Sequence, residues 1–334
     1  MEPKRRVIPV FVPHLGCPHD CVFCNQRKIS GSIHPADGDT VGKAIEEALE
    51  KTGAKENTQL AFYGGSFTAI PVEKQEELLG AALPFLRDGS ISSVRISTRP
   101  DAINEETLDR LLAFGVKTIE LGAQSMCDDV LTASGRGHKA RDTEKAAELI
   151  KQRDFELILQ MMTGLPMDTE EKSLETARKI IALAPNGVRI YPTVIIGDTM
   201  LHELWRQGKY KEHTVTAAAE LCAKLLPMFN KANIPVIRLG LNPTEELSAG
   251  AALAGAYHPA FGEIVLSRIF LDKARSLLKQ ASVRGDVILG VNPSEVSIMT
   301  GQHRCNIKKL CEELSLNSLK IKPWNVNKGE IILL

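Results

Sequence analysis

The sequence predicts an α/β fold, a partial barrel of about six β/α units followed by a small C-terminal α+β appendage. Short β-rich runs alternate with amphipathic helical segments as far as Gly240, which indicates a mainly parallel sheet. Chemically unusual residues follow the strands, at the carboxyl ends where parallel α/β folds place their sites. The chain of 334 residues therefore divides into a barrel domain, 1–240, and an appendage, 241–334.

Apolar and β-branched runs that end at glycine, proline or a small polar residue predict the strands of the barrel. These runs are Val7–Val12, Leu60–Tyr63, Val94–Ser97, Thr118–Leu121, Glu156–Met161, Val188–Tyr191 and Val236–Leu239. Segments with an apolar stripe at helical spacing predict the intervening helices. They are Val41–Lys51, Val72–Leu86, a helix capped by Asn104, Asp128–Ala133, Ala140–Gln152, Glu170–Leu183 and Thr214–Ala232.

The pattern changes after Gly240. Ser248–Tyr257 is rich in glycine and alanine and is predicted to be a linker. The appendage is predicted to contain two helices and several short strands. The helices are Phe261–Gln280 and His303–Leu314, and the strands are Val287–Gly290, Ser297–Met299 and two within Ser318–Leu334.

Composition and charge exclude several classes of protein. The chain is 43% hydrophobic and 25% charged, as in ordinary globular enzymes. Its formal net charge is zero, so an anionic partner must meet a local basic patch. No run approaches about 18 apolar residues, and the start of the chain has no signal-peptide pattern, so we expect no membrane span. A reducing cytoplasm is the simplest location for a chain whose cysteines cluster.

Three cysteines, Cys17, Cys21 and Cys24, stand at C-x3-C-x2-C spacing in a loop after the first strand. Such a loop can turn three thiolates toward one point, which suits an iron–sulfur cluster and leaves one iron open. The alternative is a structural zinc site, which needs four ligands. The nearest candidates for the fourth ligand are His14, His19 and His34.

A glycine motif, Tyr63-Gly64-Gly65-Ser66-Phe67, follows one β/α unit later. Paired glycines at a strand end let the backbone approach a ligand, although a lone pair is usually just a turn. Combined with the cysteine loop, the motif resembles the signature of the radical S-adenosylmethionine (SAM) enzymes. The resemblance implies a [4Fe-4S] cluster whose open iron binds the amine and carboxylate of SAM.

Further motifs resemble one branch of that family, the radical SAM domain of the Elongator catalytic subunit and its shorter bacterial relatives. They are Ser97-Thr98-Arg99-Pro100-Asp101, Glu120–Ser125, Gly164-Leu165-Pro166 and Arg189–Thr193. The resemblance implies a 5'-deoxyadenosyl radical that abstracts hydrogen from a substrate, with tRNA favoured and a small molecule or tetrapyrrole as the alternative. It also implies an external electron donor such as flavodoxin or ferredoxin. The alternative that is not an enzyme is a binding module whose fold is stabilised by a structural zinc ion.

The resemblance assigns roles residue by residue. Cys17, Cys21 and Cys24 would ligate the cluster, and Gly64, Gly65 and Ser66 would hold the methionyl group of SAM. Gln124 and Arg136 match SAM-contacting positions of the related oxygen-independent coproporphyrinogen dehydrogenases. Gln160 stands where the relatives carry an aspartate, and Ser97 where a glutamate is expected, so charge is lost at both positions. Catalytic residues beyond these stay unassigned.

Other polar residues could have either a structural or a functional role. Arg99 could bind a ligand or pair with Asp101, and His138 could meet a substrate anion or belong to a solvated loop. Three basic groups, Lys4-Arg5-Arg6, Lys308-Lys309 and Lys320-Ile321-Lys322, could face RNA. We predict instead that they are solvated surface, because no interleaved aromatic residues accompany them.

Overall fold

The structure is a computed structural model that describes residues 6–12, 17, 21–25, 36–52, 57–244 and 247–334. It contains two compact units. Unit 1 comprises residues up to 214 and 228–257, and unit 2 comprises residues 215–227 and 258–334. The predicted domain boundary after Gly240 stays a prediction, and each unit is described separately.

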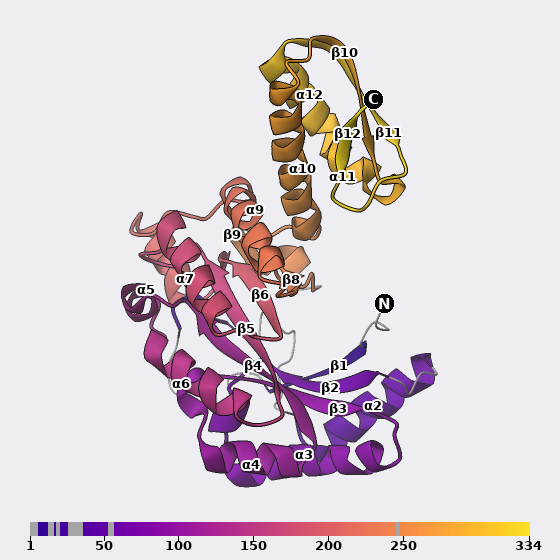
Figure 1. The fold of residues 1–334 in the computed structure, drawn as a ribbon. Helices are drawn as coiled ribbons and strands as arrows, with labels where there is room; N and C mark the ends of the chain where they lie inside the picture. The colour runs from indigo at the N-terminus through magenta and orange to yellow at the C-terminus, as the bar shows by residue number, and fades with distance from the viewer. Residues whose placement is uncertain (1–5, 13–16, 18–20, 26–35, 53–56, 245–246) are drawn as a thin grey trace. The chain divides into compact units, whose positions relative to one another are not determined.

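Unit 1 is built on a curled sheet of seven parallel strands in the order β1-β2-β3-β4-β5-β6-β8 (Figure 1). The strands are β1 (Arg6–Phe11), β2 (Thr58–Tyr63), β3 (Ser93–Thr98), β4 (Val116–Gln124), β5 (Glu156–Thr163), β6 (Gly187–Pro192) and β8 (Val236–Leu239). Each pairs in parallel with its neighbours. The curled sheet confirms the predicted partial barrel.

Helices connect successive strands, as a parallel sheet requires. They are α2 (Gly38–Thr52), α3 (Val72–Arg87), α4 (Glu105–Ala113), α5 (Asp128–Ala133), α6 (Ala140–Lys151), α7 (Glu170–Ala182), α8 (Met200–Arg206) and α9 (Val215–Lys231). The Asn104 side chain accepts a hydrogen bond from the Thr107 N–H at 2.8 Å, so it is the predicted cap of α4. Apolar side chains of the strands and helices, such as Leu60, Phe62, Leu78 and Leu108, are fully buried.

The predicted linker Ser248–Tyr257 is wrong. This segment contains a strand, β9 (Ala252–Gly255), which pairs antiparallel with β7 (Val194–Ile196). Small residues let the strands approach closely, because a Cβ on Gly255 would lie 2.9 Å from the Thr193 carbonyl oxygen. Leu247 packs with Val194 and Ile196 in a buried cluster. A glycine- and alanine-rich composition therefore marks close packing here, not a spacer.

Unit 2 packs helices against a three-stranded sheet of order β11-β10-β12. Beyond its part of α9, it contains α10 (Phe261–Gln280), β10 (Gly285–Val291), α11 (Val296–Thr300), α12 (Cys305–Leu314), β11 (Leu316–Pro323) and β12 (Ile331–Leu333). The two strands predicted within Ser318–Leu334 are confirmed. The strand predicted at Ser297–Met299 is wrong, because this run lies in α11, and a run of three residues is too short for its pattern to distinguish helix from strand.

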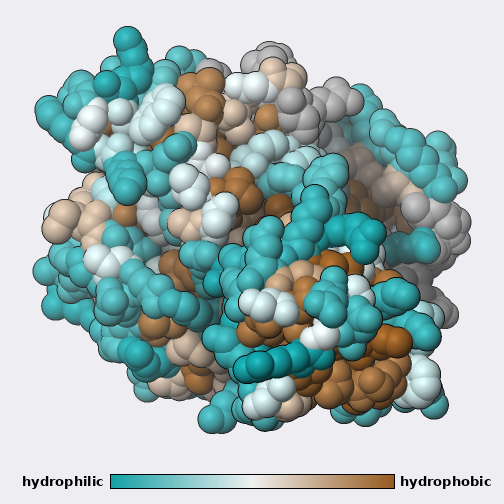
Figure 2. All heavy atoms as spheres, turned by 90° about the horizontal axis from the view of Figure 1, so that it is seen from above, coloured by the Kyte–Doolittle hydropathy of each residue, from teal (hydrophilic) through white to brown (hydrophobic). Residues whose placement is uncertain are grey.

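Polar side chains cover most of the face shown in Figure 2, with apolar ones gathered in smaller patches. Among the large hydrophobic residues, Met167, Met200 and Trp324 are the most exposed that the structure describes. Within the described ranges, no helix is long and apolar enough to cross a membrane.

Candidate functional site

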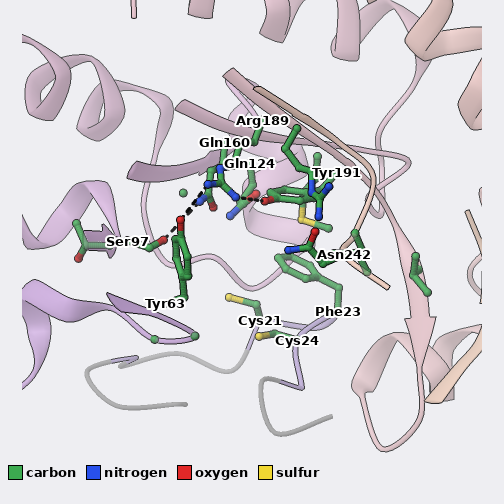
Figure 3. A pocket seen from close by; sticks show the side chains of 18 of the residues that line it. Cys21, Phe23, Cys24, Tyr63, Ser97, Gln124, Gln160, Arg189, Tyr191 and Asn242 are labelled. Carbon is green, nitrogen blue, oxygen red and sulfur yellow. Dashed lines mark hydrogen bonds between the residues drawn. The ribbon is translucent and has the colours of Figure 1, made fainter. Parts of the chain in front are cut away.

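A cavity of about 550 Å³ opens at the carboxyl ends of the strands of unit 1. Its lining includes all of the predicted site residues except Ser66. Figure 3 shows side chains from the cysteine loop, β2, β5 and β6 pointing into it. Its volume lies within the roughly 300–1,000 Å³ that is usual for small-molecule and cofactor sites.

The three cysteines approach the cavity from the loop after β1. Cys17, Cys21 and Cys24 all line it, and Figure 3 shows the Cys21 and Cys24 sulfur atoms facing inward. The Val22 N–H donates to the Ser134 carbonyl at 3.1 Å, which ties this loop to the end of α5. Arg136 Nη1 donates to Cys21 Sγ at 3.2 Å. Arg136 therefore contacts one of the predicted cluster ligands directly.

The described residues do not form a ready-made site for a single metal ion. Over the part of the chain that the structure describes, no three His, Cys, Asp or Glu side chains lie close enough to share one metal ion. The possible zinc ligands His14, His19 and His34 lie outside the described residues.

The glycine motif lies beside the cysteines. Gly64 has a φ of 94°, a conformation that glycine adopts without strain, and Gly64 and Gly65 line the cavity with backbone. Ser66 lies behind them: it is fully buried, and its hydroxyl hydrogen-bonds Thr98 at 3.0 Å. The pKa of the Cys17 thiol is raised above its usual value. Burial and the neighbouring Cys21 raise it, and these effects outweigh the opposite influence of Arg99, Arg136 and the Ser66 N–H.

Gln124 and Arg136 carry polar atoms that the described residues leave unsatisfied. Gln124 ends β4 with a φ of 62°, which is strained for a non-glycine residue and typical of functional sites. Its buried Oε1 and the buried Nε of Arg136 find no hydrogen-bond partner among those residues. Both residues line the cavity, and each therefore combines a place in the cavity wall with a buried polar atom that lacks a partner among the described residues.

Arg99 and His138 have mainly structural partners. Arg99 binds Asp101 through two hydrogen bonds of 2.9 Å each and also donates to the Arg136 carbonyl, so it positions Arg136. His138 is buried, and its Nε2 lies 3.3 Å from the Ala123 carbonyl oxygen. Burial, aided by the nearby Arg136, lowers the pKa of His138 from 6.5 to about 4. His138 is therefore neutral at physiological pH.

A polar network joins five strands beneath the cavity, centred on the fully buried carboxylate of Glu120. Arg95 Nη1 and Arg189 Nη2 donate to Glu120 Oε1 at 2.6 and 2.7 Å. Gln160 Nε2 donates to Glu120 Oε2 at 2.8 Å, and the Tyr63 hydroxyl lies 3.3 Å from Oε1. Below, "Glu120 network" means these five residues.

The carboxylate of Glu120 lies beside the two positions, Gln160 and Ser97, at which the resemblance predicts an acidic residue. Gln160 Nε2 binds Glu120 and lies 3.5 Å from Ser97 Oγ, so both uncharged residues lie beside a carboxylate supplied by the strand between them. Burial and Glu120 raise the pKa of Tyr63 to about 12, so its hydroxyl stays protonated. Figure 3 shows the Arg189, Tyr63, Gln160 and Ser97 side chains gathered at one wall.

Sequence reasoning missed several residues of this site. Glu120 and Arg95 received no role, although a charged residue inside an apolar strand already signals a buried ion pair. Phe23, Arg238 and Asn242 also line the cavity. Arg238 lies inside β8 and pairs in register with Arg189, and a charged residue within a short apolar strand could have signalled it.

Comparison with known proteins accounts for this arrangement. The profile of the Radical SAM superfamily matches residues 11–180, about half of the chain and the part that contains the cysteine loop and the glycine motif. The chain belongs to the radical SAM superfamily. A second profile, the radical SAM C-terminal domain, matches residues 185–270. This radical SAM enzyme therefore belongs to a family whose members bind a [4Fe-4S] cluster and SAM and need an electron donor.

Relatives of known name share the barrel. The radical SAM enzyme described here is 28% identical over 255 residues to a tRNA uridine(34) acetyltransferase of Methanocaldococcus jannaschii, covering 64% of this chain and 47% of the relative. It is 28% identical over 204 residues to Elongator complex protein 3 of Saccharomyces cerevisiae, covering 55% of this chain and 37% of the relative. The chain thus spans less than half the length of these relatives.

One solved structure shares the fold. The archaeal Elp3 of Methanocaldococcus infernus, lacking its N-terminal 46 residues, superimposes on this radical SAM enzyme with a TM-score of 0.62 at 24% identity. The match covers 80% of this chain and 63% of that one.

Replacing Glu120 with glutamine keeps its shape but leaves two buried arginines without their carboxylate. We expect Glu120→Gln to lower the free energy of unfolding by about 3–5 kcal/mol, measured by urea unfolding followed by circular dichroism. The matched control is Glu106→Gln, whose carboxylate is 88% exposed and lies 3.7 Å from Arg110. This change should cost less than about 1 kcal/mol. Equal losses in the two variants would contradict a structural role for the Glu120 network.

His138 should make stability depend on pH. Because its folded pKa of about 4 lies below the unfolded value of 6.5, only the unfolded chain takes up this proton as pH falls between the two. Stability should therefore decrease by about 2 kcal/mol from pH 7 to pH 5. The His138→Gln variant should lose this part of the pH dependence, whereas His202→Gln should keep it. An unchanged slope in His138→Gln would show that His138 does not titrate as described.

Proposed function

We propose that this radical SAM enzyme modifies a uridine of tRNA. The observation that carries the proposal is a single cavity lined both by the three cysteines and by arginines on the strands farthest from them in the sheet order. The names of the relatives supply the substrate class, since the archaeal relative is a tRNA uridine(34) acetyltransferase.

The residues of the cavity divide between cluster and cofactor in this proposal. Cys17, Cys21 and Cys24 would hold the [4Fe-4S] cluster. The Gly64-Gly65-Ser66 backbone and the side chains of Gln124, Arg136 and Gln160 would hold SAM, and the position of all of these except Ser66 in the cavity wall beside the cysteines supports this assignment. When bound, the reduced cluster supplies one electron that cleaves SAM to methionine and the hydrogen-abstracting 5'-deoxyadenosyl radical.

The chain itself contributes orientation and exclusion of water. Apolar side chains of Phe11, Phe23, Val194 and Ile196 line the cavity and limit the water that could reach a reactive species. Tyr63 lies on the same wall and stays protonated, held by Arg189 Nη2 at 3.0 Å. A wall fixed by so many hydrogen bonds keeps bound groups in one orientation.

Arg238 would receive an anionic group of the substrate. It pairs in register with Arg189 on the neighbouring strand, and both line the cavity. Glu120 is already shared between Arg95 and Arg189, and no carboxylate of a described residue lies within salt-bridge distance of Arg238. This wall therefore carries excess positive charge, which suits the phosphate of a nucleotide.

An external one-electron donor such as flavodoxin or ferredoxin would reduce the cluster. We place the reaction in the cytoplasm, because thiols that ligate a cluster must stay reduced.

The proposal is tested by anaerobic reconstitution followed by incubation with tRNA, SAM and a reductant. We expect iron and sulfide to bind, 5'-deoxyadenosine to form, and nucleoside mass spectrometry to detect an altered uridine. Cys21→Ser should lose both iron and SAM cleavage, since one cluster ligand is removed. The matched control, Cys305→Ser, removes an exposed cysteine of unit 2 and should leave both unchanged.

Two results would count against the proposal in different ways. Stoichiometric zinc without iron or sulfide would exclude cluster chemistry. SAM cleavage with every tRNA nucleoside unchanged would exclude the tRNA substrate and direct attention to small molecules.

The Arg238→Gln variant tests the substrate side of the cavity. We expect the KM for tRNA to rise roughly 10- to 100-fold, as loss of a charge-assisted hydrogen bond implies, while iron content stays unchanged. Arg206→Gln is the matched control, because this arginine of α8 is 63% exposed and pairs with Glu203 on its own helix. An unchanged KM for Arg238→Gln would remove Arg238 from the substrate site.

A further inference from the structure

The sheet of unit 2 has one covered face and one open face. On the central strand β10, Val287, Leu289 and Val291 are buried in a core formed with α10, α11 and α12. The alternating residues of the same strand, Ile288 and Gly290, must face the other side. Ile288 is half-exposed, so this side is open to solvent.

Two lysines of the edge strand β11 lie on the open face. Lys320 pairs in register with Ile288 and Lys322 with Gly290. Both lysines are exposed, whereas Leu319 and Ile321, between and beside them, pack with the core. The period of two along a strand therefore directs the lysines away from the helices.

An aromatic ring continues this row. Trp324 follows Lys320 and Lys322 at the same spacing, and its backbone N–H still bonds the Val291 carbonyl at 2.7 Å. A Cβ on Gly290 would lie 3.0 Å from Trp324 Cβ and 3.2 Å from its Cγ. The indole thus begins over Gly290, beside Ile332 of β12, on the open face, and Trp324 is 48% exposed.

The charge on this face is unbalanced. No acidic side chain of a described residue lies within salt-bridge distance of Lys320 or Lys322. The carboxylate at the far end of the face, Asp286, accepts a hydrogen bond from the Ser318 hydroxyl at 2.7 Å. Two unpaired cations and a flat aromatic surface, about 6–7 Å apart along one strand, are left available.

From this arrangement we propose that the open face of unit 2 binds single-stranded RNA. A base stacks on the Trp324 indole, and Lys320 and Lys322 bind the adjacent phosphates. Stacking is available to every base, and lysine is a point charge that suits a phosphate, so recognition is independent of sequence. The inference goes beyond the proposed function, because it concerns a surface outside the cavity and holds for any single-stranded RNA.

The test uses the full chain and a fluorescein-labelled oligouridylate of twelve nucleotides, with binding followed by anisotropy at several salt concentrations. Trp324→Leu should weaken binding roughly 5- to 150-fold, as the loss of one stacked base implies, and Trp324→Phe should retain most of the affinity. Lys320→Gln/Lys322→Gln should weaken binding and reduce the slope of log K against log salt by about 1.4. Circular dichroism melting checks that each variant is folded.

The matched control is the other lysine pair, Lys308→Gln/Lys309→Gln, on the exposed side of α12. It removes the same charge and should leave affinity unchanged. A second readout uses a Trp205→Phe background, in which Trp324 is the remaining tryptophan of the two. Its fluorescence should be quenched on adding the oligouridylate.

Wild-type affinity in both Trp324→Leu and Lys320→Gln/Lys322→Gln would overturn the proposal. So would equal weakening by the α12 control, which would reduce the effect to non-specific charge. Binding of a protein partner or of anionic vesicles, with no binding of the oligouridylate, would assign the face to another partner and reject RNA. None of these outcomes depends on iron content or SAM cleavage, so they are distinguishable from failure of the tRNA proposal.

Discussion

The buried carboxylate of Glu120 is the interaction on which the cavity depends. Placing a charge inside a sheet is costly unless it is paired and fully hydrogen-bonded. Glu120 meets this condition with donors from three other strands: Arg95 of β3, Gln160 of β5 and Arg189 of β6. Tyr63 of β2 adds a fifth strand to the network. Because these groups converge from separate strands, the network ties five strands of the sheet to one another at the wall of the cavity.

Two arginines that do not belong to the Glu120 network lie on opposite sides of the cavity. Glu120 neutralises only part of the positive charge that the strands direct inward, and Arg238 at the sheet edge retains its own. On the other side, Arg136 Nη1 bonds Cys21 Sγ while its Nη2 bonds the Gly122 carbonyl at 2.7 Å. One arginine thus links the cysteine loop to the end of β4, and Arg99 holds it in place. The cavity therefore has one arginine beside the cysteine loop and another at the opposite edge of the sheet.

Much of this arrangement could be predicted from sequence because it depends on local patterns. Alternating apolar runs located the strands of the barrel, and the rule that sites follow parallel strands selected residues that line one cavity. Non-local pairing was harder to predict. Nothing local shows that Glu120 would pair with Arg189, 69 positions away, or that β9 would pair with β7. Such contacts depend on strand order, which the chain defines only when folded.

Unit 2 shows a related limit of local reasoning. The lysines of β11 were assigned to solvated surface because Lys320-Ile321-Lys322 contains no aromatic residue. In a strand, however, neighbours on one face are two residues apart, so the relevant sequence is Lys320, Lys322 and Trp324, with Ile321 directed into the core. Gly290 on the adjacent strand then matters as much as the lysines, because a side chain there would displace the indole. A search for aromatic residues next to the lysines in the sequence therefore misses Trp324. A search among the residues that share one face of the sheet finds it.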